Sequence, residues 1–231
     1  MARAPSRFAR LRPEGARSGG GSGRQNSTRN YGKSVFINCP FDRRFQKLFD
    51  AFVFTIVDCG FIARCALEID NGAQNRFDKI VRLIGACALS VHDLSRTQLD
   101  RKTRLPRFNM PLELGLFLGA ERFGSGRDRK KSCVIFDTER YRYQTFISDI
   151  AGQDIKCHRD DAAVAIVELR NWLARHAPSV DIPSGGRINS RFQRFERALP
   201  QLCNDANLDR RALMFHERIK LIERWIEKVA P

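Results

Sequence analysis

The chain has 231 residues, 42% of them hydrophobic, which suffices for one domain of ordinary size together with an extension. Its formal net charge is +15, and residues 1–33 contribute eight Lys/Arg against the single acid Glu14. Because no run of 18 apolar residues is present and the N-terminal segment lacks an apolar block, we expect neither a membrane span nor a secretory signal.

The seven cysteines are scattered, and they form neither a Cys-x-x-Cys pair nor a Cys/His cluster with metal-ligand spacing. This pattern predicts a reduced, cytoplasmic protein without a zinc site. Residues 1–32 are rich in Gly, Ser and Arg, a composition typical of a disordered tail. That basic tail is either a solubilising leader or a binding segment for an anionic partner such as nucleic acid.

The apolar pattern predicts strands that alternate with helices. Short β-branched and aromatic runs indicate five strands, near residues 34–38, 61–66, 87–93, 132–136 and 154–157. Apolar residues at helical spacing indicate helices, at residues 43–59, 77–84, 109–121 and 160–175. Asp42 is placed to cap the first helix, and residues 139–149 are expected to be helical or irregular. The alternation predicts an α/β fold, with a five-stranded parallel sheet of flavodoxin-like order 2-1-3-4-5 and helices on both faces.

A Pro/Gly break at residues 183–186 separates this domain from the C-terminus. We therefore expect a disordered tail over residues 1–32, an α/β nucleotide-binding domain over 33–178 and a helical extension over 187–231. The extension should contain helices near residues 188–204 and 209–229. The last helix carries apolar residues along one face, which either packs on the sheet domain or is offered to a partner or a second copy.

Three polar segments follow predicted strands, at residues 38–42, 92–96 and 107–115. In an open α/β sheet, ligands bind at the carboxyl ends of the strands, near the switch in strand order. With the order 2-1-3, strands one and three are neighbours, so the three segments converge on one cleft. His92, at the end of strand three, is more typical of a hydrogen-bonded strand histidine than of a catalyst.

Glu113 lies near the predicted start of a helix in the third segment. Asn109 is a good N-cap and Pro111 fits the first turn, so Glu113 occupies the first or second turn. The positive end of the helix dipole is expected to favour its ionised form. Glu113 therefore either helps the helix to start or presents a carboxylate to the cleft for electrostatic or nucleophilic work.

A resemblance favours the second interpretation. Residues 34–136 resemble bacterial TIR-like (Toll/interleukin-1 receptor-like) domains and the related nucleoside 2-deoxyribosyltransferase-like proteins. The shared elements are the strands at 35–37 and 89–93 and the Asn-x-x-x-Glu-Leu-Gly helix at 109–115. In such families the glutamate of that helix is the catalytic residue that cleaves an N-glycosidic bond, and Glu113 is the matching position. The loop at 38–42 departs from the usual TIR sequence, which indicates a divergent subfamily, and the chain after residue 137 adds nothing to the resemblance.

The resemblance implies a hydrolase or transferase that acts on NAD or a related nucleotide, with NAD as substrate and no cofactor. In bacteria such domains often act as antiviral defence effectors that are switched on by assembly. The cleft positions predicted to bind the nucleotide are Asn38, Cys39, Phe41, Asp93, Arg96 and Asn109. Asp93 and Arg96 either hold ribose and phosphate or form a strand-end cap and a salt bridge. Cys39 and Phe41 also have purely structural interpretations, as a passive loop thiol and a packed ring.

Two other functions are open from the sequence alone. The domain is alternatively a non-catalytic module that senses a nucleotide or scaffolds a partner protein through its C-terminal helices. A further alternative is a nucleic-acid-associated protein that uses the basic tail, in which case its binding should weaken with salt and depend on residues 1–32.

Overall fold

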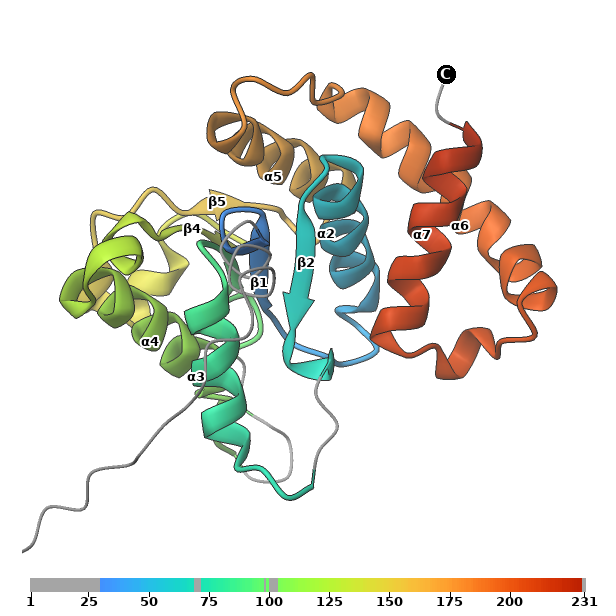
Figure 1. The fold of residues 1–231 in the computed structure, drawn as a ribbon. Coiled ribbons are helices and arrows are strands. Elements are labelled where there is room, and N and C mark those ends of the chain that lie inside the picture. The colour runs from blue at the N-terminus through green and yellow to red at the C-terminus, as the bar shows by residue number, and fades with distance from the viewer. Residues whose placement is uncertain (1–29, 69–71, 98, 100–103, 230–231) are drawn as a thin grey trace, which may run out of the picture.

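A five-stranded parallel sheet forms the centre of the protein. The structure is a computed structural model that describes residues 30–68, 72–97, 99 and 104–229. The strands are β1 (Ser34–Asn38), β2 (Ile62–Cys65), β3 (Leu89–Asp93), β4 (Ser132–Asp137) and β5 (Lys156–Cys157). They pair in the order β2-β1-β3-β4-β5, all parallel, which confirms the predicted flavodoxin-like arrangement (Figure 1). The fifth strand, predicted over four residues, is only two residues long.

The two central strands are buried on both faces. Every residue of β1 and of β3 is buried, as expected for strands covered by helices above and below. Their register pairs Asn38 with His92, so the two strands end side by side. Successive side chains of a strand point to opposite faces. Accordingly, Val35 and Ile37 join one hydrophobic cluster while Phe36 joins another.

Helices cover both faces of the sheet (Figure 1). α2 (Gln46–Asp58) and α5 (Ala162–His176) lie on the face of Val35, whereas α3 (Arg76–Ala86) and α4 (Asn109–Phe123) lie on the face of Phe36. Two C-terminal helices follow, α6 (Gly185–Asp205) and α7 (Phe215–Val229). Short 3-10 helices connect these elements, namely η1 (Ala66–Glu68), η2 (Gly126–Lys130), η3 (Arg142–Thr145), η4 (Ser148–Ile150) and η5 (Arg210–Ala212). Among the described helices, none is long and apolar enough to cross a membrane.

Three local predictions need correction. Asp42 does not cap α2, because its Oδ1 accepts from the backbone of Arg44 and Phe45 in the turn before the helix. Asn109 is the first residue of α4 and not its N-cap, a position that Phe108 occupies without a capping side chain. Tyr31, predicted to lie in the disordered tail, is buried, and its hydroxyl donates to Asp128 Oδ1 at 3.2 Å. The prediction for residues 1–29 lies outside the described residues.

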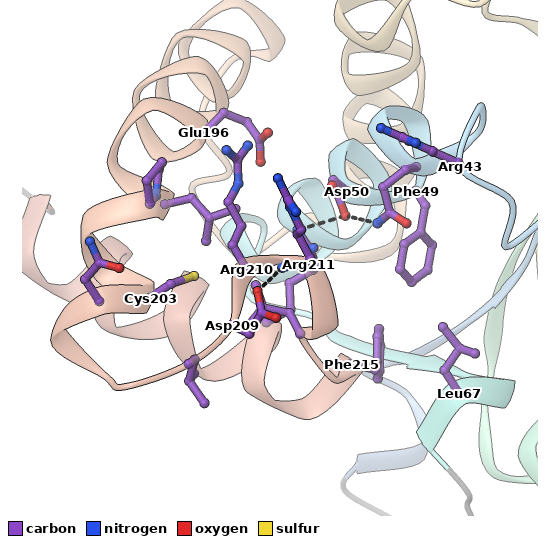
Figure 2. A pocket seen from close by; sticks show the side chains of 17 residues that line it. Arg43, Phe49, Asp50, Leu67, Glu196, Cys203, Asp209, Arg210, Arg211 and Phe215 are labelled. Atoms are coloured by element: carbon purple, nitrogen blue, oxygen red, sulfur yellow. Dashed lines mark hydrogen bonds and ion pairs between the residues drawn. The ribbon is translucent and has the colours of Figure 1, made fainter.

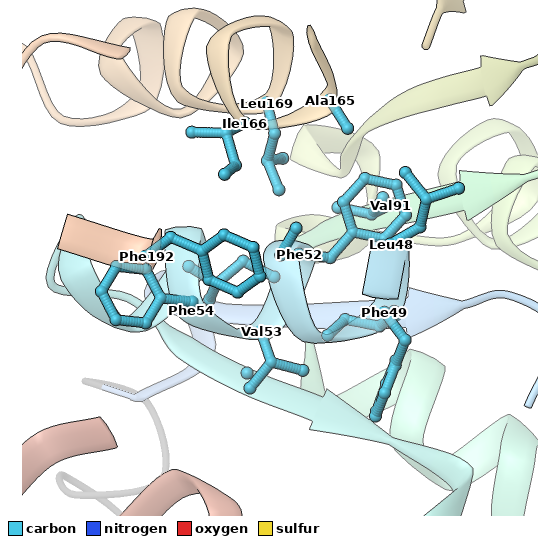
Figure 3. Close-up of a cluster of buried hydrophobic side chains, with 14 of the residues drawn as sticks. Leu48, Phe49, Phe52, Val53, Phe54, Val91, Ala165, Ile166, Leu169 and Phe192 are labelled. Atoms are coloured by element: carbon cyan, nitrogen blue, oxygen red, sulfur yellow. The ribbon is translucent and has the colours of Figure 1, made fainter. Parts of the chain in front are cut away.

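Helix α2 is packed on two sides. Phe52 faces the sheet, with its ring centroid 5.1 Å from that of Phe136 in β4. Phe54 points toward the C-terminal helices, where its ring lies 5.5 Å from Phe192, 5.4 Å from Phe195 and 5.9 Å from Trp225. All six side chains belong to one hydrophobic cluster, part of which is drawn in Figure 3. The C-terminal extension thus shares its core with the α/β domain.

Two ion pairs accompany this packing. Asp50 and Asp58, two turns apart on α2, are paired with arginines of the extension. Asp50 Oδ1 lies 3.0 Å from Arg218 Nη1 of α7, and Asp58 Oδ1 lies 3.1 Å from Arg191 Nη2 of α6. Removing one partner of a buried pair leaves an uncompensated charge, so the pairs favour this docked arrangement over others.

Phe54→Ala should therefore weaken both parts of the molecule together. We expect the free energy of unfolding to fall by about 3–5 kcal/mol, because the substitution leaves a cavity between α2 and the C-terminal helices. Urea unfolding followed by circular dichroism and by fluorescence of Trp172 and Trp225 measures it. Phe77→Ala, at a ring that is 47% exposed, is the control and should cost less than about 1 kcal/mol. A separate early transition of α6 and α7 would contradict the shared core.

Candidate functional site

The side-chain amide of Asn38 joins the ends of β1 and β3 to the start of α4. Its Nδ2 donates to the carbonyl oxygen of Met110 at 2.8 Å and to Nδ1 of His92 at 2.9 Å. Because Nδ1 accepts, the ring proton of His92 lies on Nε2, which is 2.8 Å from Ser90 Oγ. Burial lowers the pKa of His92 to about 3, so the ring is neutral. His92 is thus a structural histidine, as its position in the strand indicated.

Glu113 lies in the second turn of α4 and is buried, with 8% of its surface exposed. Burial raises the pKa of its carboxyl to about 7, and the positive charge of Arg76 offsets this only in part. We expected the helix N-terminus to favour the ionised form, but desolvation has the larger effect. Within the described part of the chain, no hydrogen bond or ion pair to this carboxylate is present. A largely buried acid with a raised pKa and no partner among the described residues is characteristic of functional sites.

Cys39 lies close to this carboxylate and is 2% exposed. Burial, followed by the negative charges of Asp93 and, more weakly, Glu113, raises the pKa of its thiol well above the usual value. The thiol is therefore protonated near neutral pH and is a poor nucleophile. These contacts favour the passive interpretation of Cys39.

Asp93 is fully buried and has protein partners on both oxygens. Oδ1 accepts from the backbone N–H and the hydroxyl of Ser95, and Oδ2 lies 3.0 Å from His158 Nε2. Since His158 Nδ1 accepts from the backbone of Asp160, the ring proton is on Nε2 and is donated to Asp93. Of the two interpretations of Asp93, these bonds favour a strand-end anchor over a ribose ligand.

Arg96 contacts Asp160, with Nη2 3.3 Å from Oδ1. Its side chain is 22% exposed, and its buried Nε has no hydrogen-bond partner among the described residues. One further arginine was not foreseen from the sequence. Arg142 Nε donates to Asp137 Oδ1 at 2.8 Å, and its Nη2 donates to the carbonyl of Leu94 at 2.7 Å. These two bonds connect the loop after β3 to the end of β4.

The remaining candidates lie at the surface. Phe41 is 38% exposed, and its ring packs edge-on against Phe49 of α2 at 5.4 Å. Asn109 is exposed in the first turn of α4. The structure thus brings Asn38, Cys39 and Glu113 to one edge of the sheet. Residues 98 and 100–103, which connect β3 to α4, lie outside the described residues, and Glu113 lines none of four cavities found among the described ones.

A second polar region was missed entirely by sequence reasoning. A cavity of about 1070 Å³ lies between α2, the second half of α6 and the start of α7 (Figure 2). Asp50 and Glu196 face it from opposite helices, and burial raises the pKa of both carboxyls, to about 6 for Asp50. No local motif marks these residues, because only the docking of the extension brings them together.

We compared the chain with protein-family models, with curated proteins and with solved structures, and none of the three comparisons found a match. Among the described residues, no group of three or more His, Cys, Asp or Glu side chains is placed to hold a metal ion. The residues at the edge of β1 and β3 therefore carry the functional argument alone.

The raised pKa of Glu113 predicts a pH-dependent cost in stability. Below pH 4.5, the usual pKa of a glutamate carboxyl, the group is mostly protonated in both the folded and the unfolded chain. Between pH 4.5 and about 7 the unfolded chain has released this proton while the folded chain still holds it, so stability is lost as the pH rises through this range. We expect Glu113→Gln to increase the free energy of unfolding by up to about 3 kcal/mol at pH 8 and to change it little at pH 4.

Urea unfolding at both pH values measures this difference. Glu121→Gln, on the same helix and only half-buried, is the matched control and should show no such pH dependence. Equal effects of Glu113→Gln at pH 4 and pH 8 would show that burial does not disfavour the charge of Glu113.

Proposed function

We propose that the protein hydrolyses the N-glycosidic bond between nicotinamide and ribose in NAD, or the equivalent bond of a related nucleotide, with Glu113 as the catalytic carboxylate. The observation that carries the proposal is Glu113 itself, a buried acid in the second turn of α4 that has a raised pKa and no hydrogen bond or ion pair among the described residues. It stands beside the adjacent ends of β1 and β3, where open parallel sheets bind their ligands. The resemblance to TIR-like domains points to the same residue.

The electrostatics of Glu113 suit this reaction. When the bond between C1′ of the ribose and the nicotinamide nitrogen breaks, the electron pair leaves with nicotinamide, which becomes neutral. The ribose develops oxocarbenium character, water adds to C1′, and the proton of that water passes to solvent. A carboxylate with little solvent around it stabilises such a cation more strongly than one in water.

The charge of the substrate also sets the protonation state. Glu113 alone, with a pKa of about 7, is partly protonated near neutral pH. A cationic nicotinamide ring placed beside it favours the ionised carboxylate, since an opposite charge lowers the pKa of an acid. Because nicotinamide leaves without needing a proton, the reaction requires no separate general acid. That agrees with a sheet edge where His92 is neutral and Asp93 is held by its neighbours.

The nucleotide-binding residues divide into two groups in this proposal. Asn38, Cys39 and Asp93 are buried and position the edge. Arg96, Phe41 and Asn109 are exposed enough to touch a ligand, with the guanidinium of Arg96 toward phosphate and the ring of Phe41 toward a base.

We place the activity in the bacterial cytoplasm, as an effector of antiviral defence. All seven cysteines are free thiols, as expected in a reducing compartment. Assembly through the outer surfaces of α6 and α7 and nucleic-acid binding by the N-terminal tail stay predictions from the sequence.

The decisive assay is release of nicotinamide from NAD. We expect the wild-type protein, tested up to high concentration, to release nicotinamide, and Glu113→Gln to lose at least about 10²-fold in rate, because the developing cation loses its counter-charge. Glu121→Gln, on the same helix, is the control and should keep the wild-type rate.

Equal rates for the wild type and Glu113→Gln would remove Glu113 from the reaction. If neither protein turns over NAD while both bind it saturably, the nucleotide-sensing alternative replaces the hydrolase.

A further inference from the structure

The cavity between α2, α6 and α7 is lined by arginines from three separate segments (Figure 2). Arg43 comes from the turn before α2, Arg210 and Arg211 from η5, and Arg218 from the first turn of α7. With a volume of about 1070 Å³, the cavity has the size of sites that hold nucleotide-sized molecules. It lies on the α2 side of the sheet, whereas Glu113 is on the α4 side.

Only one of these arginines is paired with an acid. Arg218 is 10% exposed and contacts Asp50 at 3.0 Å. Arg43, Arg210 and Arg211 are exposed, and among the described residues their guanidinium groups form no ion pair or hydrogen bond. Three like charges that border one hollow repel each other, and an anion with several oxygen atoms would relieve that repulsion.

Of the acids that line the cavity, Asp50 and Asp209 already accept hydrogen bonds from the protein. Asp50 is held by Arg218 and by Gln46 Nε2, which donates to it at 2.8 Å. Asp209 accepts the backbone N–H of Arg211 at 2.8 Å and thereby begins η5. Glu196, by contrast, has a buried Oε1 for which the described part of the chain provides no hydrogen-bond partner. A buried acceptor in this state costs stability, and a donating hydroxyl group would satisfy it.

We propose that this cavity is a second binding site, for a small molecule with phosphate groups at one end and hydroxyl groups at the other, as in a nucleotide. The phosphates contact Arg43, Arg210 and Arg211, and a hydroxyl group donates to Glu196 Oε1. The ligand touches both the turn before α2 and the extension, so it fastens the C-terminal helices to the α/β domain. This site does not depend on the reaction proposed for Glu113.

Binding of ADP and of inorganic pyrophosphate, measured by isothermal titration calorimetry, tests the phosphate end. Arg210→Gln/Arg211→Gln should weaken both probes about tenfold or more, because charge-assisted hydrogen bonds to phosphate are lost. Arg224→Gln/Lys228→Gln removes the same charge from exposed positions of α7 that do not line the cavity, and should leave both affinities within about twofold. Glu113→Gln should bind pyrophosphate as the wild type does.

The substituted arginines are exposed, and their guanidinium groups have no ion pair among the residues that the structure describes, so circular dichroism and the melting temperature without ligand should match the wild type. Wild-type affinity in Arg210→Gln/Arg211→Gln, or an equal loss in Arg224→Gln/Lys228→Gln, would overturn the site. A loss in Glu113→Gln alone would assign the binding to the other edge of the sheet instead.

The hydroxyl end has its own readout. Glu196→Ala should lower the ratio of ADP affinity to pyrophosphate affinity several-fold, since only ADP offers hydroxyl groups to Oε1. An unchanged ratio would overturn the role of Glu196 and leave a plain anion site.

Discussion

The hydrogen bonds of the Asn38 amide fix the geometry on which the candidate site depends. One N–H of Nδ2 reaches the Met110 carbonyl at the start of α4, and the other reaches Nδ1 of His92 in β3. The second bond needs a neutral His92 with its proton on Nε2, and complete burial maintains that state. The N-cap position of α4, Phe108, supplies no capping hydrogen bond, and the bond from the Asn38 amide to the Met110 carbonyl fixes the start of the helix against the sheet. Glu113 follows Met110 by less than one helical turn, so this contact also positions Glu113.

At the same edge of the sheet, the carboxylates of Asp93 and Asp137 are held by hydrogen bonds, whereas that of Glu113 is in an unfavourable environment. Asp93 is satisfied on both oxygens, and Asp137 is held by Arg142. Glu113 is buried without such a partner, a state that costs free energy when the carboxylate is charged. Proteins often accept that kind of cost at functional sites and offset it elsewhere in the core. Here the hydrophobic cluster around α2, shared between the α/β domain and the C-terminal helices, supplies the offsetting burial.

The features that depend on the local pattern of apolar and polar residues could be predicted from the sequence. The buried runs of β1 and β3 and the alternation of strands and helices determined the strand order, and hence that Asn38 and His92 would be neighbours. Local pattern failed where a side chain had several possible partners. Asn109 looks like a cap, yet the helix begins with it. The partner of Asp93 is His158, 65 residues away, and no periodicity encodes that bond.

The protonation state of Glu113 and the arginine-lined cavity were not predicted, because both depend on long-range packing. The helix dipole argued for an ionised Glu113, whereas burial, which depends on the whole fold, raises its pKa. In the sequence, the arginines of η5 and α7 cannot be distinguished from ordinary surface charges. These arginines line a cavity together with Arg43 and Asp50 because α6 and α7 pack against Phe54 of α2. Among the described residues, these two polar regions therefore lie on opposite faces of the sheet, and only the first was foreseen from the sequence.

A crystal structure of the Glu113→Gln protein soaked with NAD shows which of the two regions binds the nucleotide and in which orientation. The account predicts that the nicotinamide ribose lies at the ends of β1 and β3, with a ribose hydroxyl within hydrogen-bonding distance of the residue 113 side chain. A nicotinamide ribose bound only in the cavity between α2, α6 and α7, or pointing away from residue 113, would contradict the catalytic role of Glu113.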